Sequence, residues 1–248
     1  LFLTPSGGVS YWPGEREASG WGTNYAGHFL LEAEMKGYEL PAGFIENWKR
    51  YQRNQANAWV ANYGNTYYHD DLEQAYRLYT LALAKSPELG AMNRLKEVQI
   101  DNGAKAKLAL AYFYAGKTDV AKSMLATIPV EIAPYIDDRY TYGSHHVDQA
   151  YLLELFLKLG DKANAYTFFR KNISTLNSRN YLGTQATAML LKSISSYLVK
   201  YKVEPIDISA NYNGKAYSLK GNKPAYSQAV DPVTGNLTLT NNTNAITV

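Results

Sequence analysis

The chain has 248 residues, of which 46% are hydrophobic and 19% charged, so it can bury a core and does not have the composition of a disordered protein. A net charge of +3, without dense runs of Lys and Arg, excludes nucleic acid as the expected partner. Because the chain contains no Cys, disulfides, thiolate metal sites and Cys nucleophiles are excluded within it.

Residues 1–20 are predicted to form a glycine-rich loop. A helix over residues 23–36 follows, and Gly37 is expected to cap its C-terminal end. The next helix, residues 41–62, is predicted to start at Pro41, because a proline in the first turn loses no helical hydrogen bond.

The helix predicted over residues 70–85, DDLEQAYRLYTLALAK, is apolar on almost every side. A helix of this kind must be buried, either among other helices or in lipid. It is too short for a bilayer span and carries charge at both ends, so we expect other helices to surround it.

The remaining helices alternate between two types. Those starting near residues 104, 144 and 184 are apolar on most sides, like those near 23 and 70, whereas the helices between them are short or one-sided. The predicted helices of this part span residues 88–99, 104–115, 119–127, 144–159, 162–175 and 183–201. Alternation of this kind is typical of an inner layer wrapped by an outer layer. We therefore expect a mainly α protein, in which residues 1–202 form two layers of consecutive helical hairpins.

The composition changes at Val203. Residues 206–211, 215–220 and 237–240 alternate apolar and polar side chains, and Asn213-Gly214 is a strong hairpin signal. Residues 203–248 are therefore predicted to form a short β segment with an incomplete sheet.

Two groups of residues could carry chemistry. His145, His146 and Asp148 suggest a metal site, but adjacent side chains on a helix point about 100° apart, and no third ligand has a suitable spacing. A polar first turn of a buried helix explains them more simply, and the sequence predicts no metal and no cofactor.

The acid pairs Asp70-Asp71 and Asp137-Asp138 are of the kind that a glycosidase uses as acid and base. The same acids are more simply explained as helix N-caps. An aromatic group of Tyr11, Trp12, Trp21 and Tyr25 could stack on sugars, but we expect it to close one end of the helical core.

Five segments resemble bacterial alpha-2-macroglobulins, and more narrowly the large surface-protein type of Bacteroidetes. In chain order they are GGVSYWPG (7–14), WGTNYAGHFLLEAEMKGYELP (21–41), EQAYRLYTLALA (73–84) with GAMNRL (90–95), YGSHHVDQAYLL (142–153) and GTQATAMLL (183–191). The last segment, which contains Thr184 and Gln185, also resembles the STQxT stretch of animal alpha-2-macroglobulins and complement thioester proteins.

The resemblance implies an α/α toroid, the thioester-containing domain, inserted into a β domain of CUB type. Residues 1–202 would form this toroid, incomplete on its N-terminal side, and residues 203–248 part of the CUB-like domain. Such proteins are non-enzymatic traps: a protease cuts a bait region, the molecule closes on it, and an internal thioester can capture it covalently. The family's Cys-x-Glu-Gln motif lies upstream of the segment that resembles residues 7–14. This chain has no Cys and cannot form the thioester by itself.

In complement thioester proteins a His in a loop of this domain assists acyl transfer. The loop Thr66-Tyr67-Tyr68-His69 is the nearest match in this sequence. A neutral imidazole at His69 could act as general base or transient nucleophile, although capping or packing is the simpler role.

The leading hypothesis is thus a part of an exported, periplasmic or cell-surface, alpha-2-macroglobulin-like inhibitor of endopeptidases. Its partners would be proteases, met through the full-length parent, and neighbouring macroglobulin-like β domains of the same chain. Two alternatives stay open: a carbohydrate-active α/α-barrel enzyme that uses the paired Asp residues, and a helical-repeat interaction module suggested by LALAYFYAGKTDVAKSML (108–125).

Overall fold

The computed structural model describes residues 2–61, 70–135, 143–178, 181–201, 206–221, 229 and 234–243. The chain divides into two compact units, Leu1–Ile194 and Ser195–Val248. The boundary predicted between residues 202 and 203 lies outside the described residues.

Nine helices occupy the described residues, which confirms the mainly α prediction. They are α1 (Gly20–Met35), α2 (Phe44–Ala58), α3 (Asp70–Leu83), α4 (Leu89–Lys96), α5 (Asn102–Tyr114), α6 (Thr118–Leu125), α7 (His145–Leu159), α8 (Lys162–Asn177) and α9 (Thr184–Tyr201). Within the described residues, none of these helices is long and apolar enough to cross a membrane.

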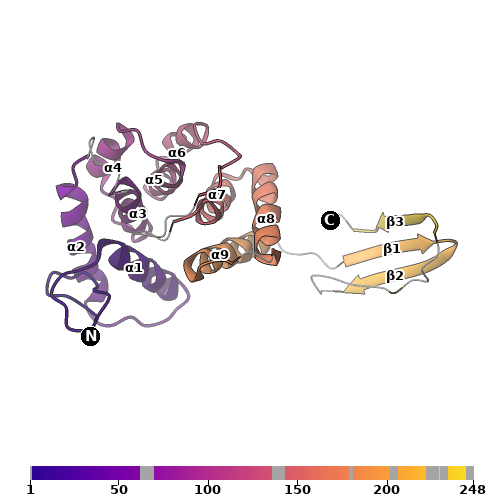
Figure 1. Ribbon diagram of the computed structural model, residues 1–248, viewed down its shortest axis with the longest axis horizontal. Coiled ribbons are helices and arrows are strands. Elements are labelled where there is room, and N and C mark those ends of the chain that lie inside the picture. The colour runs from indigo at the N-terminus through magenta and orange to yellow at the C-terminus, as the bar shows by residue number, and fades with distance from the viewer. Residues whose placement is uncertain are drawn as a thin grey trace. The chain divides into compact units, whose positions relative to one another are not determined.

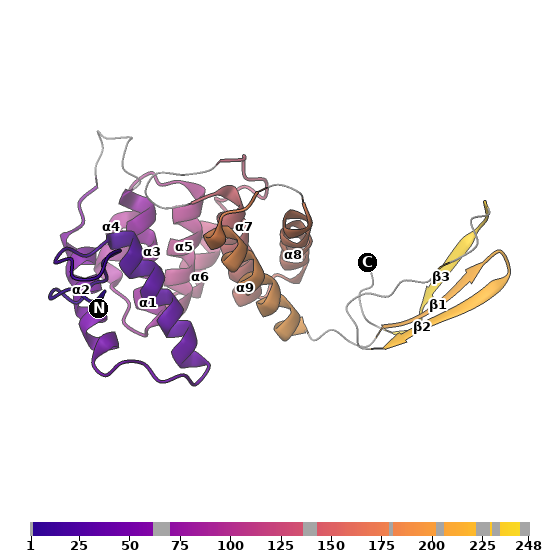
Figure 2. The ribbon, with the colours of Figure 1, turned by 60° about the horizontal axis from the view of Figure 1, so that its bottom comes forward.

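The helices form two layers. In the inner layer α1 packs against α3, α3 against α5 and α5 against α7. Among the even-numbered helices, α2 packs on α3, α4 on α3 and α5, α6 on α5, and α8 on α7. Figures 1 and 2 show the odd-numbered helices on the inside and the even-numbered ones around them. The predicted arrangement of helical hairpins is confirmed.

Helix α3 lies at the centre of this unit, as its sequence predicts. Its apolar side chains Leu78, Tyr79 and Leu81 have no exposed surface. Its polar residues Gln74 and Arg77 are buried as well, so α3 is enclosed on the sides where its sequence is polar.

Glycines with positive φ set two helix boundaries. Gly37 has a φ of +86°, and its N–H donates to Glu34 O, so the predicted C-terminal cap of α1 is confirmed. The prediction that α2 starts at Pro41 is wrong. Gly43, with a φ of +72°, breaks the helical path between Pro41 and Phe44, so α2 begins at Phe44.

The predicted aromatic group is divided in the structure. Trp21 is 4% exposed and belongs to the core, whereas Trp12 is 71% exposed at the tip of the N-terminal loop. Trp12 therefore does not close the helical core, and neither does Tyr11, which is 51% exposed.

The second unit contains an antiparallel sheet of β1 (Ile206–Tyr212), β2 (Lys215–Gly221) and β3 (Leu237–Asn241) in the order β2-β1-β3. Asn213 and Gly214 have φ values of 51° and 80° and link β1 to β2, which confirms the predicted hairpin.

Candidate functional site

Several predicted site residues cannot be placed. Tyr67, Tyr68 and His69 lie outside the described residues, and so do Asp137 and Asp138. Asp70 is the first residue of α3. Asp71 Oδ1 accepts a hydrogen bond from the N–H of Leu72 at 2.9 Å, in the first turn of that helix.

Two of the segments that carry the family resemblance meet in the core. Gln185, in the first turn of α9, accepts a hydrogen bond from Trp21 Nε1 at 3.2 Å, although 164 positions separate the two residues. Its neighbour Thr184 is the exposed first residue of the helix. Gln185 therefore joins the segment GTQAT to the segment WGTNYAGHF.

The suggested metal residues are engaged in other contacts. Asp148 faces the ammonium of Lys107, with 3.8 Å between Nζ and Oδ1, and accepts a hydrogen bond from Tyr135. His145 Nδ1 lies 3.1 Å from the carbonyl oxygen of Tyr135. In the part of the chain that the structure describes, no three His, Cys, Asp or Glu residues are arranged to hold a metal ion.

A partly exposed polar cluster connects helices of the inner layer. Its charged members are Glu32 of α1, Glu154 of α7 and Lys192 of α9, joined by His28 of α1. Lys192 Nζ lies 2.9 Å from Glu32 Oε1 and 3.1 Å from Glu154 Oε2. One ammonium group thereby connects α1, α7 and α9.

Tyrosines complete this cluster. The hydroxyl of Tyr79 donates to Glu154 Oε1 at 2.9 Å, and that of Tyr114 to the same oxygen at 3.2 Å. His28 Nδ1 lies 2.9 Å from the hydroxyl of Tyr76. The carboxylate of Glu154 thus has partners from α3, α5 and α9, which a buried charge requires.

Burial and the charge of Lys192 act on the pKa in the same direction for His28 and in opposite directions for the two carboxylates. Burial lowers the pKa of His28, and the Lys192 charge lowers it further. Burial by itself raises the pKa of Glu32, but the neighbouring His28 ring and the charge of Lys192 bring it down to about 2. For Glu154 the Lys192 charge likewise outweighs burial and lowers the pKa. At neutral pH the cluster therefore holds two carboxylates, one ammonium and a neutral imidazole.

There is little room for a ligand beside the cluster. The cavity bounded by Tyr151, Glu154, Met189 and Lys192 has a volume of about 10 Å³, which is about the space of one water. The cluster is therefore suited to holding helices together rather than to binding an organic substrate.

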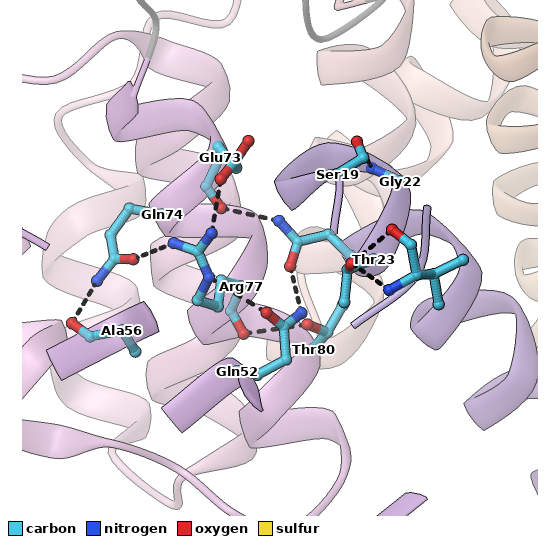
Figure 3. Close-up of polar contacts among 11 residues, drawn as sticks. Ser19, Gly22, Thr23, Gln52, Ala56, Glu73, Gln74, Arg77 and Thr80 are labelled. Atoms are coloured by element: carbon cyan, nitrogen blue, oxygen red, sulfur yellow. Dashed lines mark hydrogen bonds and ion pairs between the residues drawn. The ribbon is translucent and has the colours of Figure 1, made fainter. Parts of the chain in front are cut away.

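A second polar network fixes the start of α3 against α1 and α2 (Figure 3). The guanidinium of Arg77 donates to Gln52 Oε1 at 3.2 Å, to Gln74 Oε1 at 2.6 Å and to Glu73 Oε1 at 2.6 Å. Asn24 of α1 joins it, since its side chain accepts from Gln52 and donates to the carbonyl oxygen of Glu73. The helix that follows the predicted loop 66–69 is thus rigidly anchored.

Neither network is predicted by the sequence. Glu154 in YLLELFL and Lys192 in AMLLKSI each place a charge within an apolar stretch, and a buried charge needs a partner. That signal indicates that partners exist but not which ones, because His28 and Lys192 are 164 positions apart.

Comparison with known proteins connects this geometry to one group. No protein-family profile and no curated protein matches the sequence. Solved structures do match. An Escherichia coli alpha-2-macroglobulin structure from domain MG7 to the C-terminus is 19% identical with a TM-score of 0.70, over 97% of this chain and 37% of that chain. Salmonella alpha-2-macroglobulin reacted with methylamine is 20% identical with a TM-score of 0.69, over 97% and 15%.

A third match is trypsin-activated alpha-2-macroglobulin from Escherichia coli, 19% identical with a TM-score of 0.68, over 97% of this chain and 16% of that chain. The chain thus spans well under half the length of each structure. At these identities the similarity establishes the fold. The chain has the fold of the matching region of bacterial alpha-2-macroglobulins, and the predicted mainly α fold with a short β segment is confirmed.

Proposed function

We propose that this chain is the helical, thioester-type part of an exported bacterial alpha-2-macroglobulin-like protease trap, together with part of its β domain. The observation that carries the proposal is a fold similarity that extends over 97% of the chain. The matching Escherichia coli proteins include forms activated by trypsin and by porcine elastase. The role proposed here is inhibitory and not enzymatic.

The second unit supports the presence of a neighbouring β domain. In its sheet Ile208 lies opposite Leu219, and Ala210 lies opposite both Tyr217 and Leu239, so these side chains share one face. Leu239 is 61% exposed. A one-sided apolar sheet needs a second layer to cover it. We propose that further strands of the parent supply this layer, as in a CUB-type β domain.

The thioester itself would come from another part of the parent, because this chain has no Cys. We propose that Tyr67, Tyr68 and His69 form the loop beside it, immediately before α3. The Arg77 network, which holds α3 against α1 and α2, would keep the end of that loop in a fixed position. In this arrangement His69, in its neutral form, would serve as general base for acyl transfer.

The contact between Trp21 and Gln185 supports the assignment of the STQxT-like segment. Gln185 is used for packing α9 against α1. Thr184, which is exposed, is the residue of that segment available to a neighbouring domain.

The proposal can be tested on the full-length parent protein. Its intact mass is measured before and after treatment with methylamine, and free thiols are counted. Gain of one methylamine together with one new thiol supports a thioester and covalent capture. An unchanged mass in freshly prepared, uncut protein contradicts the thioester part of the proposal.

The trap function has a separate test. After a stoichiometric amount of the parent is added, trypsin is assayed on a large protein substrate and on a small chromogenic peptide. A trap blocks cleavage of the large substrate and leaves the small one accessible, because the protease is enclosed but not inactivated. Equal activity on the large substrate with and without the parent contradicts the trap function.

A further inference from the structure

The ring nitrogens of His28 lie close to two tyrosine hydroxyls and one ammonium group. Its Nδ1 is 2.9 Å from the hydroxyl of Tyr76, and its Nε2 is 3.3 Å from Lys192 Nζ and 3.4 Å from the hydroxyl of Tyr79. The side chain is almost completely buried.

These distances fix the tautomer. An ammonium group can only donate, so His28 Nε2 must accept from Lys192 and cannot carry a hydrogen. The ring hydrogen is therefore on Nδ1 and is donated to Tyr76. Protonation of His28 would place an N–H on Nε2, directed at the ammonium of Lys192.

Protonated His28 would also compete with Lys192 for one carboxylate. Glu32 Oε1 lies 2.9 Å from Lys192 Nζ and 3.6 Å from His28 Nε2. An imidazolium on the same helix as Glu32, four positions away, is a ready replacement for the ammonium of α9. Binding of Glu32 to Lys192 and protonation of His28 are thus mutually opposed.

We infer that His28 and Lys192 form an acid-sensitive contact that holds α9 against α1 and is released when His28 takes up a proton. This inference concerns the described helices themselves and does not depend on the proposed protease trap. It gives the inner layer a defined place of opening, since α9 meets α1 through Lys192 with Glu32 and through Gln185 with Trp21.

His28 is the group of the cluster suited to respond to mild acid. The titratable groups around it are Glu32 on its own helix, Tyr76 and Tyr79 of α3, Tyr114 of α5, Tyr151 and Glu154 of α7, and Lys192 of α9. Glu32 and Glu154 have lowered pKa values and stay ionised, the tyrosines have raised values, and Lys192 has a raised value. Between pH 7.5 and 5.5 the imidazole is the group whose ordinary pKa is crossed.

The size of the effect follows from linkage. Burial keeps the pKa of His28 low while α9 is in place, and the largest effect arises if release of α9 restores the ordinary value of about 6.5. Lowering the pH from 7.5 to 5.5 therefore favours the released state by up to about tenfold.

The test is amide hydrogen exchange of the 248-residue chain at pH 7.5 and 5.5, corrected for the intrinsic pH dependence of exchange. We expect exchange in peptides of α9 to rise by up to about tenfold at pH 5.5, with a smaller rise in α4 and α6. In His28→Gln the amide oxygen can still accept from Lys192 but cannot titrate, so the rise should disappear. His145→Gln, which removes the histidine at the start of α7, is the matched control, and the rise in exchange should persist in it.

No rise in the wild-type chain, or an equal rise in His28→Gln, overturns the inference. If His28→Gln does not fold, Lys192→Met replaces it. In that variant the amides of α9 should exchange as fast at pH 7.5 as those of the wild type do at pH 5.5. The ratio of its α9 exchange rates at the two pH values should be near one. A pH-dependent rise that persists in Lys192→Met also overturns the inference.

Discussion

Lys107 and Asp148 form an ion pair inside the helical core, with 3.8 Å between Nζ and Oδ1 and 2% of each side chain exposed. The ammonium also lies 4.2 Å from the centre of the Tyr151 ring. Gly103 provides the space for the carboxylate, because a Cβ at this position would lie 2.3 Å from Asp148 Oδ1. The pair occupies the place where the sequence suggested a metal ligand.

We predict that Asp148→Asn lowers the free energy of unfolding by about 3–5 kcal/mol, since it leaves the Lys107 charge buried and unpaired. Urea unfolding measures the loss. The double variant Lys107→Met with Asp148→Asn should recover much of it, because neither charge then remains. A double variant that is as unstable as the sum of the two single variants would contradict the ion-pair role.

The exposed fractions of two leucines predict that the same substitution costs much more stability at one than at the other. Leu153 of α7 is fully buried, whereas Leu191 of α9 is 54% exposed. Leu153→Asp removes about 1.5–3 kcal/mol of apolar burial and adds an unpaired buried charge, so we expect a loss of several kcal/mol or failure to fold. Leu191→Asp should change stability by less than about 1 kcal/mol. Similar urea midpoints for both variants would contradict the burial of Leu153 and the exposure of Leu191.

The helices and the β hairpin could be predicted from the sequence because local signals determine them. Apolar periodicity identified the helices to within a few residues, and Gly37 and Asn213-Gly214 marked a helix end and a turn. The start of α2 was misplaced because Pro41 is also compatible with the residues just before a helix, and Gly43 decided the matter.

The polar cluster could not be predicted in the same way. Glu154 and Lys192 signal buried charges, but their pairing depends on how α7 and α9 meet, and periodicity within one helix does not contain that information. In the Arg77 network Gln74 lies three positions before Arg77 on α3 and is a local partner, whereas Gln52 comes from α2 and depends on how the two helices meet. The loop with His69, outside the described residues, stays a prediction from the family resemblance.

Gly27 of α1 leaves no room for a side chain, whereas Gly90 of α4 does. A Cβ on Gly27 would lie 2.2 Å from Trp48 Nε1, and the fully buried indole donates to the carbonyl oxygen of Thr23. Gly27→Ala should therefore destabilise the chain by about 1–3 kcal/mol, because the Trp48 ring must move. At Gly90 of α4 a Cβ meets nothing closer than 3.9 Å, so Gly90→Ala should stabilise by up to about 1 kcal/mol. Thermal unfolding of the two variants measures both changes in stability. A gain in stability at both positions would contradict the close packing of α1 on α2.

Glu32 predicts a specific acid dependence of stability. Its pKa is about 2 in the folded chain, against a value of 4.5 for an unperturbed Glu. A lowered carboxyl pKa contributes stability that is present above the unfolded value and is lost as the pH falls through the folded one. This shift of about 2.5 units corresponds to about 3 kcal/mol at pH 5 and about 1.5 kcal/mol at pH 3.

We therefore expect Glu32→Gln to lower the free energy of unfolding by about 3 kcal/mol at pH 5 and by about half as much at pH 3, as measured by urea unfolding at low salt. Glu46→Gln is the matched control, since Glu46 pairs with Lys49 on the exposed face of α2. Its effect should stay below about 1 kcal/mol at both pH values, because an exposed pair contributes little. A difference between wild type and Glu32→Gln that does not shrink as the pH falls would show that Glu32 is not stabilised as a carboxylate by Lys192.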